Sequence, residues 1–539
     1  MLFLKRLGTF SPALLAAIAL AGCSSAPKSL ASTAPDVPTT ATASLPAGAP
    51  PTTTAATLIA TGPDHPAPTP LNRDRMRAEM NAVFAPLLKK HGAQVSAEVR
   101  TLDGDQLVYA LNPELALTPA STIKLFTAYA ALKKLGPAAT FKTSLYTDGK
   151  NLYLRGGGDP SLVTERFFLL ASQSRLNGLP AVRGKLYIDQ SLFDPELRSP
   201  VRIDQDSDRA YNAPVTALSL NYNAMTVHVH PGDKVGAPAL ASIDPEGGYA
   251  RLSNAVRTVP AGRPTHLHVS REEGDHDDNR LDSVDALQVT GQIAVDAPDK
   301  EQYLNVAQSM NYAGQVFCRY LNQQGVKMSC DHAIRAGKVP PEARLLAEQE
   351  SPSVGEIVRL MNKYSNNFIA ESLAKSLSPA EIKTTEGGLE TIRAQLSALG
   401  LNPVAGGSAT ATPATLQFAS ASGLSRLNRV SAHDFDQALV RIAQDFSVFP
   451  EFLASLPLAH ADGTLKKRFK NYLGPGVIRA KSGSIDGARA LAGYAQRKDG
   501  QRLVFSLVIN GAESFDENGF AAALLQDEAV SGSSPLTQR

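Results

Sequence analysis

The chain contains no tryptophan, only three cysteines and almost no excess of charge of either sign. Its 53 lysines and arginines nearly balance its 51 aspartates and glutamates, which leaves a formal net charge of +2. This balance gives no electrostatic reason to expect a nucleic-acid partner. Hydrophobic residues nevertheless make up 43% of the 539 residues. That fraction suits a globular protein with a sizeable core, and the length suits about two to four domains.

Cysteine is too sparse, and wrongly placed, for a zinc site. Cys318 and Cys330 stand on either side of Gly325 without a nearby pair of histidines. In an exported protein, the oxidising compartment favours a disulfide between them. Two free buried thiols are the alternative.

Near the N-terminus, the apolar run Leu14–Leu20 is too short to favour a membrane-spanning helix. It follows the basic residues Lys5 and Arg6 and precedes small residues. A basic start, a short apolar run and a small-residue cleavage point are typical of secretory signals. We therefore predict that residues 1–22 form a signal peptide.

The end of this signal reads LAGC and finishes at Cys23. These letters resemble a bacterial lipobox, which implies cleavage before Cys23 and a lipid on its sulfur. A plain signal peptide with an incidental cysteine is the alternative. By resemblance to lipoproteins, Ser24 favours the outer membrane of a Gram-negative bacterium. We therefore expect a periplasmic protein that is attached to the membrane through Cys23.

Composition divides the rest of the chain into four parts. Residues 23–72 are rich in Ala, Pro, Thr and Ser, cannot bury a core and are predicted to be a tether. Helical periods and alternating strands predict two parts of one catalytic domain at 73–145 and 352–539. Residues 146–351 consist of short alternating segments between Gly and Pro, with no long helical period before about 311. We predict that this region is a β-rich insertion of one or two domains.

The segment TPASTIKLFTAYA contains a serine and a lysine, Ser121 and Lys124, that share one face at the start of a predicted helix. A hydroxyl is a poor nucleophile without a neighbouring base. Lysine can be that base when burial or nearby positive charge lowers its pKa. Because serine is also a common N-cap residue, the pair alone is a weak signal.

Two later segments strengthen the catalytic interpretation. Ser365 and Asn367 form S-x-N before an apolar helix, where a second hydroxyl can relay a proton and an amide can position the substrate. Lys481 opens the run KSGS in a strand-like context, and its charge suits a carboxylate. In that run, Gly483 lets an extended substrate lie against the strand edge.

These three elements, in this order along the chain, resemble the penicillin-binding protein and serine β-lactamase superfamily. The long insertion between Ser121 and Ser365 resembles the penicillin-binding protein 4-type D-alanyl-D-alanine carboxypeptidases and endopeptidases. Four further segments agree: GGGDPSL at 156–162, APVTALS at 213–219, SGLSR at 422–426 and DGTL at 462–465. The resemblance implies an α/β (α+β) fold. In this fold, helices would flank the antiparallel sheet of a transpeptidase-like core, and a large β-rich insertion would separate the first two motifs.

The resemblance also implies a reaction and its residues. Ser121 would be the acylated nucleophile and Lys124 its general base. Ser365 would pass the proton onward, Asn367 would contact the substrate amide, and Lys481 would shape the electrostatics. The substrates would be peptidoglycan stem peptides and their cross-links. β-Lactams would acylate the same serine, and neither a metal nor an organic cofactor would be needed.

The resemblance implies the substrate contacts as well. The hydroxyls of Ser482 and Ser484 would hold the terminal carboxylate beside Gly483, and the backbone N–H groups of Ser121 and Ser484 would form the oxyanion hole. In the SGLSR segment, Ser422 would belong to the substrate site. Arg426 would read the diaminopimelate carboxylate, while Asp206 or Asp208 of the insertion would bind that residue's ammonium group.

Some features depart from the family pattern or allow another reading. The third motif reads K-S-G where K-T-G is commoner, and Asp486 places a carboxylate where neutral residues are usual. A shift of one residue would make Tyr364 the second-motif side chain, as in class C β-lactamases and related esterases. A β-lactamase, an esterase and a non-catalytic wall-binding relative therefore remain alternatives. The pairs His228 with His230 and His266 with His268 could bind zinc, although polar faces of insertion strands are the favoured interpretation.

Overall fold

The computed structural model describes residues 71–525, except 180, 205, 272–283, 331 and 470–476. The predicted signal peptide, the lipidation site Cys23 and all but the end of the predicted tether lie outside these residues. Among the described helices, none combines the length and the apolar character that crossing a bilayer requires.

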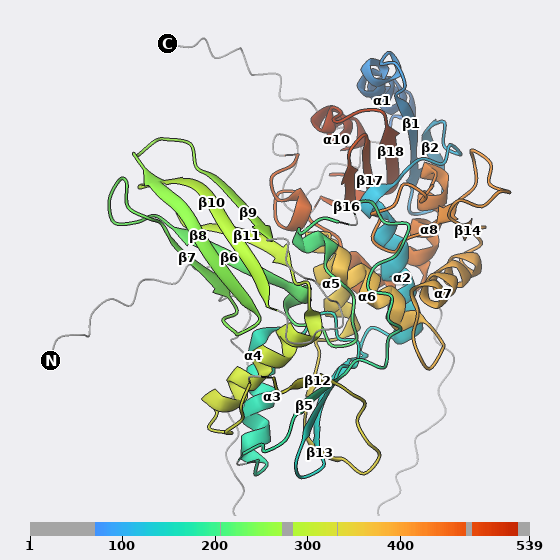
Figure 1. Cartoon of the computed structure of the whole chain (residues 1–539). Coiled ribbons are helices and arrows are strands. Elements are labelled where there is room, and N and C mark those ends of the chain that lie inside the picture. Colours follow the sequence, from blue (N-terminus) through green and yellow to red (C-terminus); the bar gives the residue numbers. More distant parts are fainter. Residues whose placement is uncertain are drawn as a thin grey trace, which may run out of the picture. The chain divides into compact units, whose positions relative to one another are not determined.

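The catalytic core is built on a five-stranded antiparallel sheet with strand order β16-β17-β18-β1-β2, seen in Figure 1. The strands are β1 (Gln94–Thr101), β2 (Leu107–Leu111), β16 (Ile478–Ile485), β17 (Ala488–Gln496) and β18 (Arg502–Asn510). Successive residues of β18 alternate between two hydrophobic clusters, as the period of a strand requires: Phe505 belongs to one, and Val504 and Val508 belong to the other. Helices therefore cover both faces of this sheet, as the sequence predicts.

One face is covered by the first and last described helices, α1 (Arg73–Leu88) and α10 (Glu517–Leu525), which pack together through Phe84 and Phe520. The other face carries the helical layer. It consists of the 3₁₀ turn η1 (Ala120–Ile123), α2 (Lys124–Leu135), α5 (Val354–Tyr364), α6 (Asn367–Leu377), α7 (Thr385–Ala398), α8 (Ala432–Gln444) and α9 (Phe449–Ser455). The short strands β14 (Val404–Ala405) and β15 (Gln417–Phe418) and the turn η4 (Gly463–Leu465) connect these helices. Because its first nine residues are all buried, α2 is the central helix of this layer.

The insertion begins with a mixed sheet of order β12-β5-β4-β3-β13. Its elements are β3 (Lys142–Thr147), β4 (Leu152–Arg155), α3 (Thr164–Leu176), β5 (Leu186–Asp189), α4 (Ser309–Gln323), β12 (Ile334–Ala336) and β13 (Arg344–Glu350). Since β3 pairs with β13, the inserted sheet starts at Lys142, slightly before the predicted boundary.

The prediction of no long helical period before about 311 was wrong. Helix α3 spans 13 residues and buries Phe167, Leu170, Ala171 and Ser174, which recur at helical spacing. The helix packs on α4 through Phe167 and Phe317. The signal was present in the sequence, but Gly and Pro in the flanking segments obscured it.

The remainder of the insertion is made of strands, in two three-stranded sheets of order β11-β6-β7 and β8-β10-β9. Their strands are β6 (Ala224–His230), β7 (Leu240–Asp244), β8 (Ala250–Val259), β9 (His266–Arg271), β10 (Asp285–Ala294) and β11 (Lys300–Asn305). Two short 3₁₀ turns, η2 (Ala210–Asn212) and η3 (Asn221–Asn223), precede them. Cys318 of α4 and Cys330 form a disulfide, with a Cα–Cα distance of 5.8 Å.

Candidate active site

Ser121 lies in the 3₁₀ turn η1, and Lys124 is the first residue of α2. The preceding residue, Ala120, has φ of +48°, a left-handed conformation that side chains rarely adopt and that is often found at functional sites. The Lys124 Nζ atom donates a hydrogen bond to Ser121 Oγ over 3.0 Å. The first two predicted residues therefore face each other at a distance that allows proton transfer.

The Lys124 amine also donates to Asn367 Oδ1 over 2.7 Å and to the carbonyl oxygen of Ser422. Its side chain is completely buried, and this loss of water lowers the pKa of Lys124 well below that of a free lysine. The positive charge of Lys481 lowers the pKa further, whereas the carboxylate of Glu371 raises it. Burial thus favours the neutral amine, which is the form that can accept a proton.

Ser365 lies between helices α5 and α6 in a left-handed conformation, with φ of +55°. Its Oγ atom accepts a hydrogen bond from Lys481 Nζ over 2.9 Å. The neighbouring Asn366 caps α6 by accepting from the backbone N–H of Ile369, whereas the Tyr364 side chain is 71% exposed. The structure therefore directs Ser365, rather than Tyr364, toward Lys481.

Lys481 is completely buried on β16, and burial lowers its pKa to about 7, with a further contribution from the charge of Arg468. Its Nζ atom also donates to the carbonyl oxygen of Ser482 over 2.6 Å. The Ser482 hydroxyl bonds Thr464 Oγ1 over 2.9 Å, and Ser484 is exposed further along the strand. Strand β16 therefore carries two hydroxyls beside a buried amine.

The strand β16 is the edge strand of this sheet, and β17 is its only partner among the named strands. Residues 457–459 bond the first part of its other side, through a bridge between Leu458 and Arg479. Beyond this bridge, the backbone from Lys481 onward can accept an extended peptide on the side away from β17. At Gly483 a Cβ atom would stand 2.4 Å from the carbonyl oxygen of Pro119 and 3.1 Å from the backbone nitrogen of Ser121. Only glycine lets this strand approach the nucleophile turn so closely.

Arg426 and Ser422 occupy different positions relative to this cleft. Arg426 donates from Nη2 to the carbonyl oxygen of Asp486 over 3.0 Å, at the far end of β16. The sequence places Ser422 among the substrate contacts, but its side chain is fully buried and its hydroxyl bonds Ser420 Oγ over 3.2 Å. Ser422 contributes its backbone carbonyl oxygen to the site, because this atom accepts a hydrogen bond from Lys124.

The segments that carry Asn367, Ser422 and Gly483 thus meet the segment that carries Ser121 and Lys124. The comparison with known proteins identifies the family. The model of the D-Ala-D-Ala carboxypeptidase 3 (S13) family matches residues 79–529, most of the chain. The chain belongs to this family. The predicted family, fold class and serine D-alanyl-D-alanine carboxypeptidase activity are therefore confirmed.

Individual relatives support the same conclusion. A D-alanyl-D-alanine carboxypeptidase of Actinomadura sp. (strain R39) is 31% identical over 460 residues, which cover 81% of each chain. The D-alanyl-D-alanine carboxypeptidase DacB of Haemophilus influenzae is 26% identical over 448 residues, covering 79% of this chain and 87% of that protein. The crystal structure of penicillin binding protein 4 (dacB) from Haemophilus influenzae shares the fold, with a TM-score of 0.67 at 22% identity over 85% of this chain and 98% of that one.

One residue of the S13 site, Glu371, was not predicted from the sequence. Glu371, on α6, is buried, and its Oε1 atom accepts from the Ser420 hydroxyl and from the backbone N–H of Ser422, each over 3.0 Å. It therefore fixes the turn whose carbonyl oxygen faces Lys124. Its place four residues after Asn367, on the same helical face, is a signal that the sequence offered.

The two acidic residues that the sequence suggests for the ammonium contact differ in their surroundings. Asp208 forms an ion pair with Arg271 of β9, which occupies the carboxylate. Asp206 is exposed. In this S13 enzyme the insertion reaches the catalytic core near Ser422, because the backbone N–H of Ile203, three residues before Asp206, donates to the carbonyl oxygen of Leu424 over 3.0 Å.

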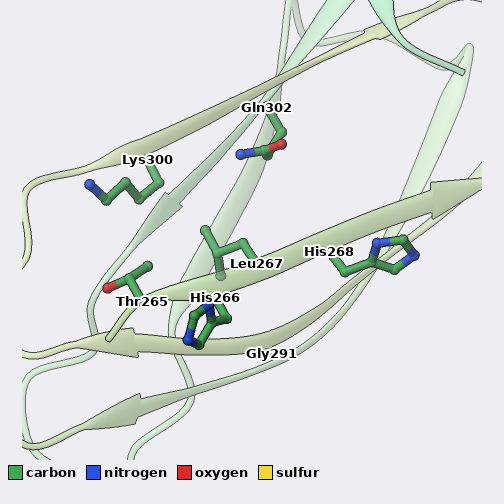
Figure 2. A pocket seen from close by; sticks show the side chains of 7 residues that line it. All are labelled: Thr265, His266, Leu267, His268, Gly291, Lys300 and Gln302. Atoms are coloured by element: carbon green, nitrogen blue, oxygen red, sulfur yellow. The ribbon is translucent and has the colours of Figure 1, made fainter. Parts of the chain in front are cut away.

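The histidine pair of β9 lines a groove of about 430 Å³, shown in Figure 2. Its walls include Leu267, Gly291 and the β11 residues Lys300 and Gln302. The rings of His266 and His268 lie apart along the strand (Figure 2). Within the part of the chain that the structure describes, no three histidine, cysteine or acidic side chains gather as metal ligands would.

Proposed function

We propose that the protein hydrolyses peptidoglycan stem peptides and the D-alanyl–diaminopimelate cross-links between them, through an acyl-enzyme on Ser121. The observation that carries this proposal is the buried amine of Lys124, which lies 3.0 Å from Ser121 Oγ. A neutral amine at this distance can take the hydroxyl proton as the oxygen attacks the carbonyl carbon of the penultimate D-alanine. The backbone N–H groups of Ser121 and Ser484 would stabilise the resulting oxyanion.

The second half of the acylation step needs a proton at the leaving nitrogen. Ser365, held by Lys481 over 2.9 Å, is the hydroxyl that passes this proton on. The amide C–N bond then breaks, D-alanine or the second stem peptide leaves as an amine, and the acyl group stays on Ser121. Water next attacks the ester while Lys124 takes one of the water's protons. The bond between the acyl carbon and Ser121 Oγ then breaks, Ser121 Oγ takes that proton from Lys124, and the shortened peptide is released as the acid. The hydroxyls of Ser482 and Ser484 would hold the terminal carboxylate beside Lys481.

The proposed reaction is tested by measuring D-alanine release from a pentapeptide stem together with the lifetime of the penicillin adduct. We expect steady release of D-alanine, blocked in proportion to the fraction of protein that carries penicillin, because both acyl donors use Ser121. A pentapeptide whose terminal D-alanine is replaced by L-alanine is the matched control and should remain intact. Rapid penicillin turnover without D-alanine release would instead indicate a β-lactamase.

We further propose that the mature chain is attached through Cys23 to a membrane facing the periplasm, with residues 23–72 as a tether. The sequence LAGC and its Ala-, Pro- and Thr-rich continuation support this. We expect Cys23→Ser to move the protein from the membrane fraction to the soluble fraction of cells, because the lipidated thiol is lost. The control is Ser25→Ala, which leaves the thiol in place. Retention of the Cys23→Ser protein on membranes would contradict lipid attachment.

A further inference from the structure

A cavity of about 390 Å³ opens next to the second catalytic motif. Ser365 and Asn367 line it from the catalytic core, whereas Asp244 of β7 and Tyr303 of β11 line it from the insertion. Its volume falls within the range of about 300–1,000 Å³ that is typical of small-molecule sites. The insertion and the catalytic core therefore form this space together, directly beside the reacting groups.

Tyrosines dominate the wall of this cavity. Tyr211, Tyr303 and Tyr364 all line it, and their exposed fractions are 39%, 54% and 71%. Large aromatic side chains gathered around an open hollow are a feature of binding sites, because their faces pack on alkyl groups and amides while their hydroxyls form hydrogen bonds. The wall thus suits a ligand with methylene groups and peptide bonds.

A strained turn holds the insertion side of the cavity in place. Asn221, Tyr222 and Asn223 have φ values of +47°, +61° and +49°, and such strain persists only where surrounding contacts impose it. The Asn223 amide donates to the carbonyl oxygen of Pro214 over 2.9 Å, and the Tyr222 ring packs edge-on against Phe368 of α6 at 6.2 Å. The cavity wall is therefore fixed to the helix that begins with Asn367.

The direction of proton transfer in the proposed reaction determines which part of the substrate faces this cavity. In the proposed reaction, Ser365 gives its proton to the leaving nitrogen, so whatever is bonded to that nitrogen lies on the Ser365 side. D-Alanine carries a single methyl group and would leave most of the space unfilled. Asp244 is the only charged side chain among the described residues that line the cavity, so a second carboxylate is disfavoured and amide or amine N–H groups are favoured.

We infer that this cavity is a subsite for the second stem peptide of a cross-link, on the leaving side of the scissile bond. This inference rests on the proposed function and extends it to the endopeptidase substrate. The alkyl side chain of the leaving diamino acid lies against Tyr303 and Tyr364, and N–H groups of its peptide donate to Asp244. A monomeric stem peptide, which releases only D-alanine, does not reach these residues.

The test compares a cross-linked peptide dimer with a monomeric pentapeptide as substrates for the full chain. We expect Tyr303→Ala to lower kcat/KM for the dimer about tenfold, mainly through KM, and to leave the monomer value within about twofold. Asp244→Asn should lower kcat/KM for the dimer by a smaller factor than Tyr303→Ala does. The control is Leu240→Ala, an exposed residue at the other end of β7, which should change neither value. Equal effects of Tyr303→Ala on dimer and monomer, or no effect on either, would overturn the inference.

Two further measurements distinguish a peptide subsite from a glycan site, and a failure of the subsite from a failure of the proposed function. The dimer is supplied with and without its sugars, and an effect of Tyr303→Ala that requires the sugars would assign the cavity to the glycan strand and overturn a peptide subsite. Binding of the dimer is also measured on a Ser121→Ala background, where we expect Tyr303→Ala to weaken Kd about tenfold. If the unmodified enzyme cleaves neither substrate, the proposed function fails, whereas an unchanged Kd overturns the subsite alone.

Discussion

Replacing Ser121 with alanine is expected to abolish the covalent penicillin adduct and to lower kcat/KM for D-alanine release by at least about 10³-fold. The substitution removes the only hydroxyl that lies 3.0 Å from the buried Lys124 amine among the described hydrogen bonds. The fold should persist, because among the described residues the Ser121 hydroxyl bonds only Lys124 and, over 3.4 Å, the carbonyl oxygen of Ser422. Labelling with fluorescent penicillin and intact-mass measurement detect the adduct directly.

The matched control is Ser447→Ala, which removes the hydroxyl of an exposed serine between α8 and α9. This variant should label as the unmodified protein does. Equal labelling of the Ser121→Ala protein would show that Ser121 is not the acylated nucleophile and that another hydroxyl of the cleft is.

Replacing Lys124 with glutamine is expected to lower kcat/KM by about 10³-fold, because the amide keeps hydrogen-bonding capacity but cannot take a proton. Lys133→Gln is the control on the same helix. Lys133 lies at the surface, with its side chain 41% exposed and paired with Asp445 over 2.7 Å, so its replacement should change activity by less than about twofold. Single-turnover acylation by penicillin measures the affected step without interference from deacylation. A Lys124→Gln protein that acylates at the normal rate would exclude this lysine as the base.

The same lysine predicts the direction of the pH dependence. Its neutral form is the active one, so kcat/KM should rise with pH as the amine loses its proton. Burial and the charges of Lys481 and Arg202 lower the pKa of Lys124, and Glu371 opposes them. Glu371→Gln keeps the acceptor for Ser420 and removes the negative charge, so the pKa falls further. The acid limb of the kcat/KM profile should then move to lower pH. A move to higher pH would show that Glu371 does not act through charge.

Much of the site was predictable because helical and strand periods are local properties. The S-x-x-K spacing placed Ser121 beside Lys124, and the strand context of KSG placed Lys481 on β16. The choice between Ser365 and Tyr364 was harder, because it depends on a left-handed residue between two helices, and a serine there has no local signature.

Contacts between distant segments were not predictable from local patterns. The Ser422 carbonyl oxygen reaches Lys124 only after the SGLSR turn has packed against the nucleophile turn, and no sequence motif encodes the direction of a carbonyl group. Likewise, the sequence suggested strands for the insertion but not that η3 would rest on α6 through Tyr222 and Phe368. In both cases tertiary packing determines which atoms meet.

Two glycines enclose the nucleophile turn from opposite segments of the chain. A Cβ atom at Gly423 would stand 2.1 Å from the carbonyl oxygen of Ala120, and one at Gly483 would stand 2.4 Å from that of Pro119. Any side chain at either position would displace the turn that carries Ser121. Mutations that conferred drug resistance by narrowing the cleft at these two places would therefore disable the enzyme as well. Escape from β-lactams by steric exclusion would have to arise elsewhere along the cleft.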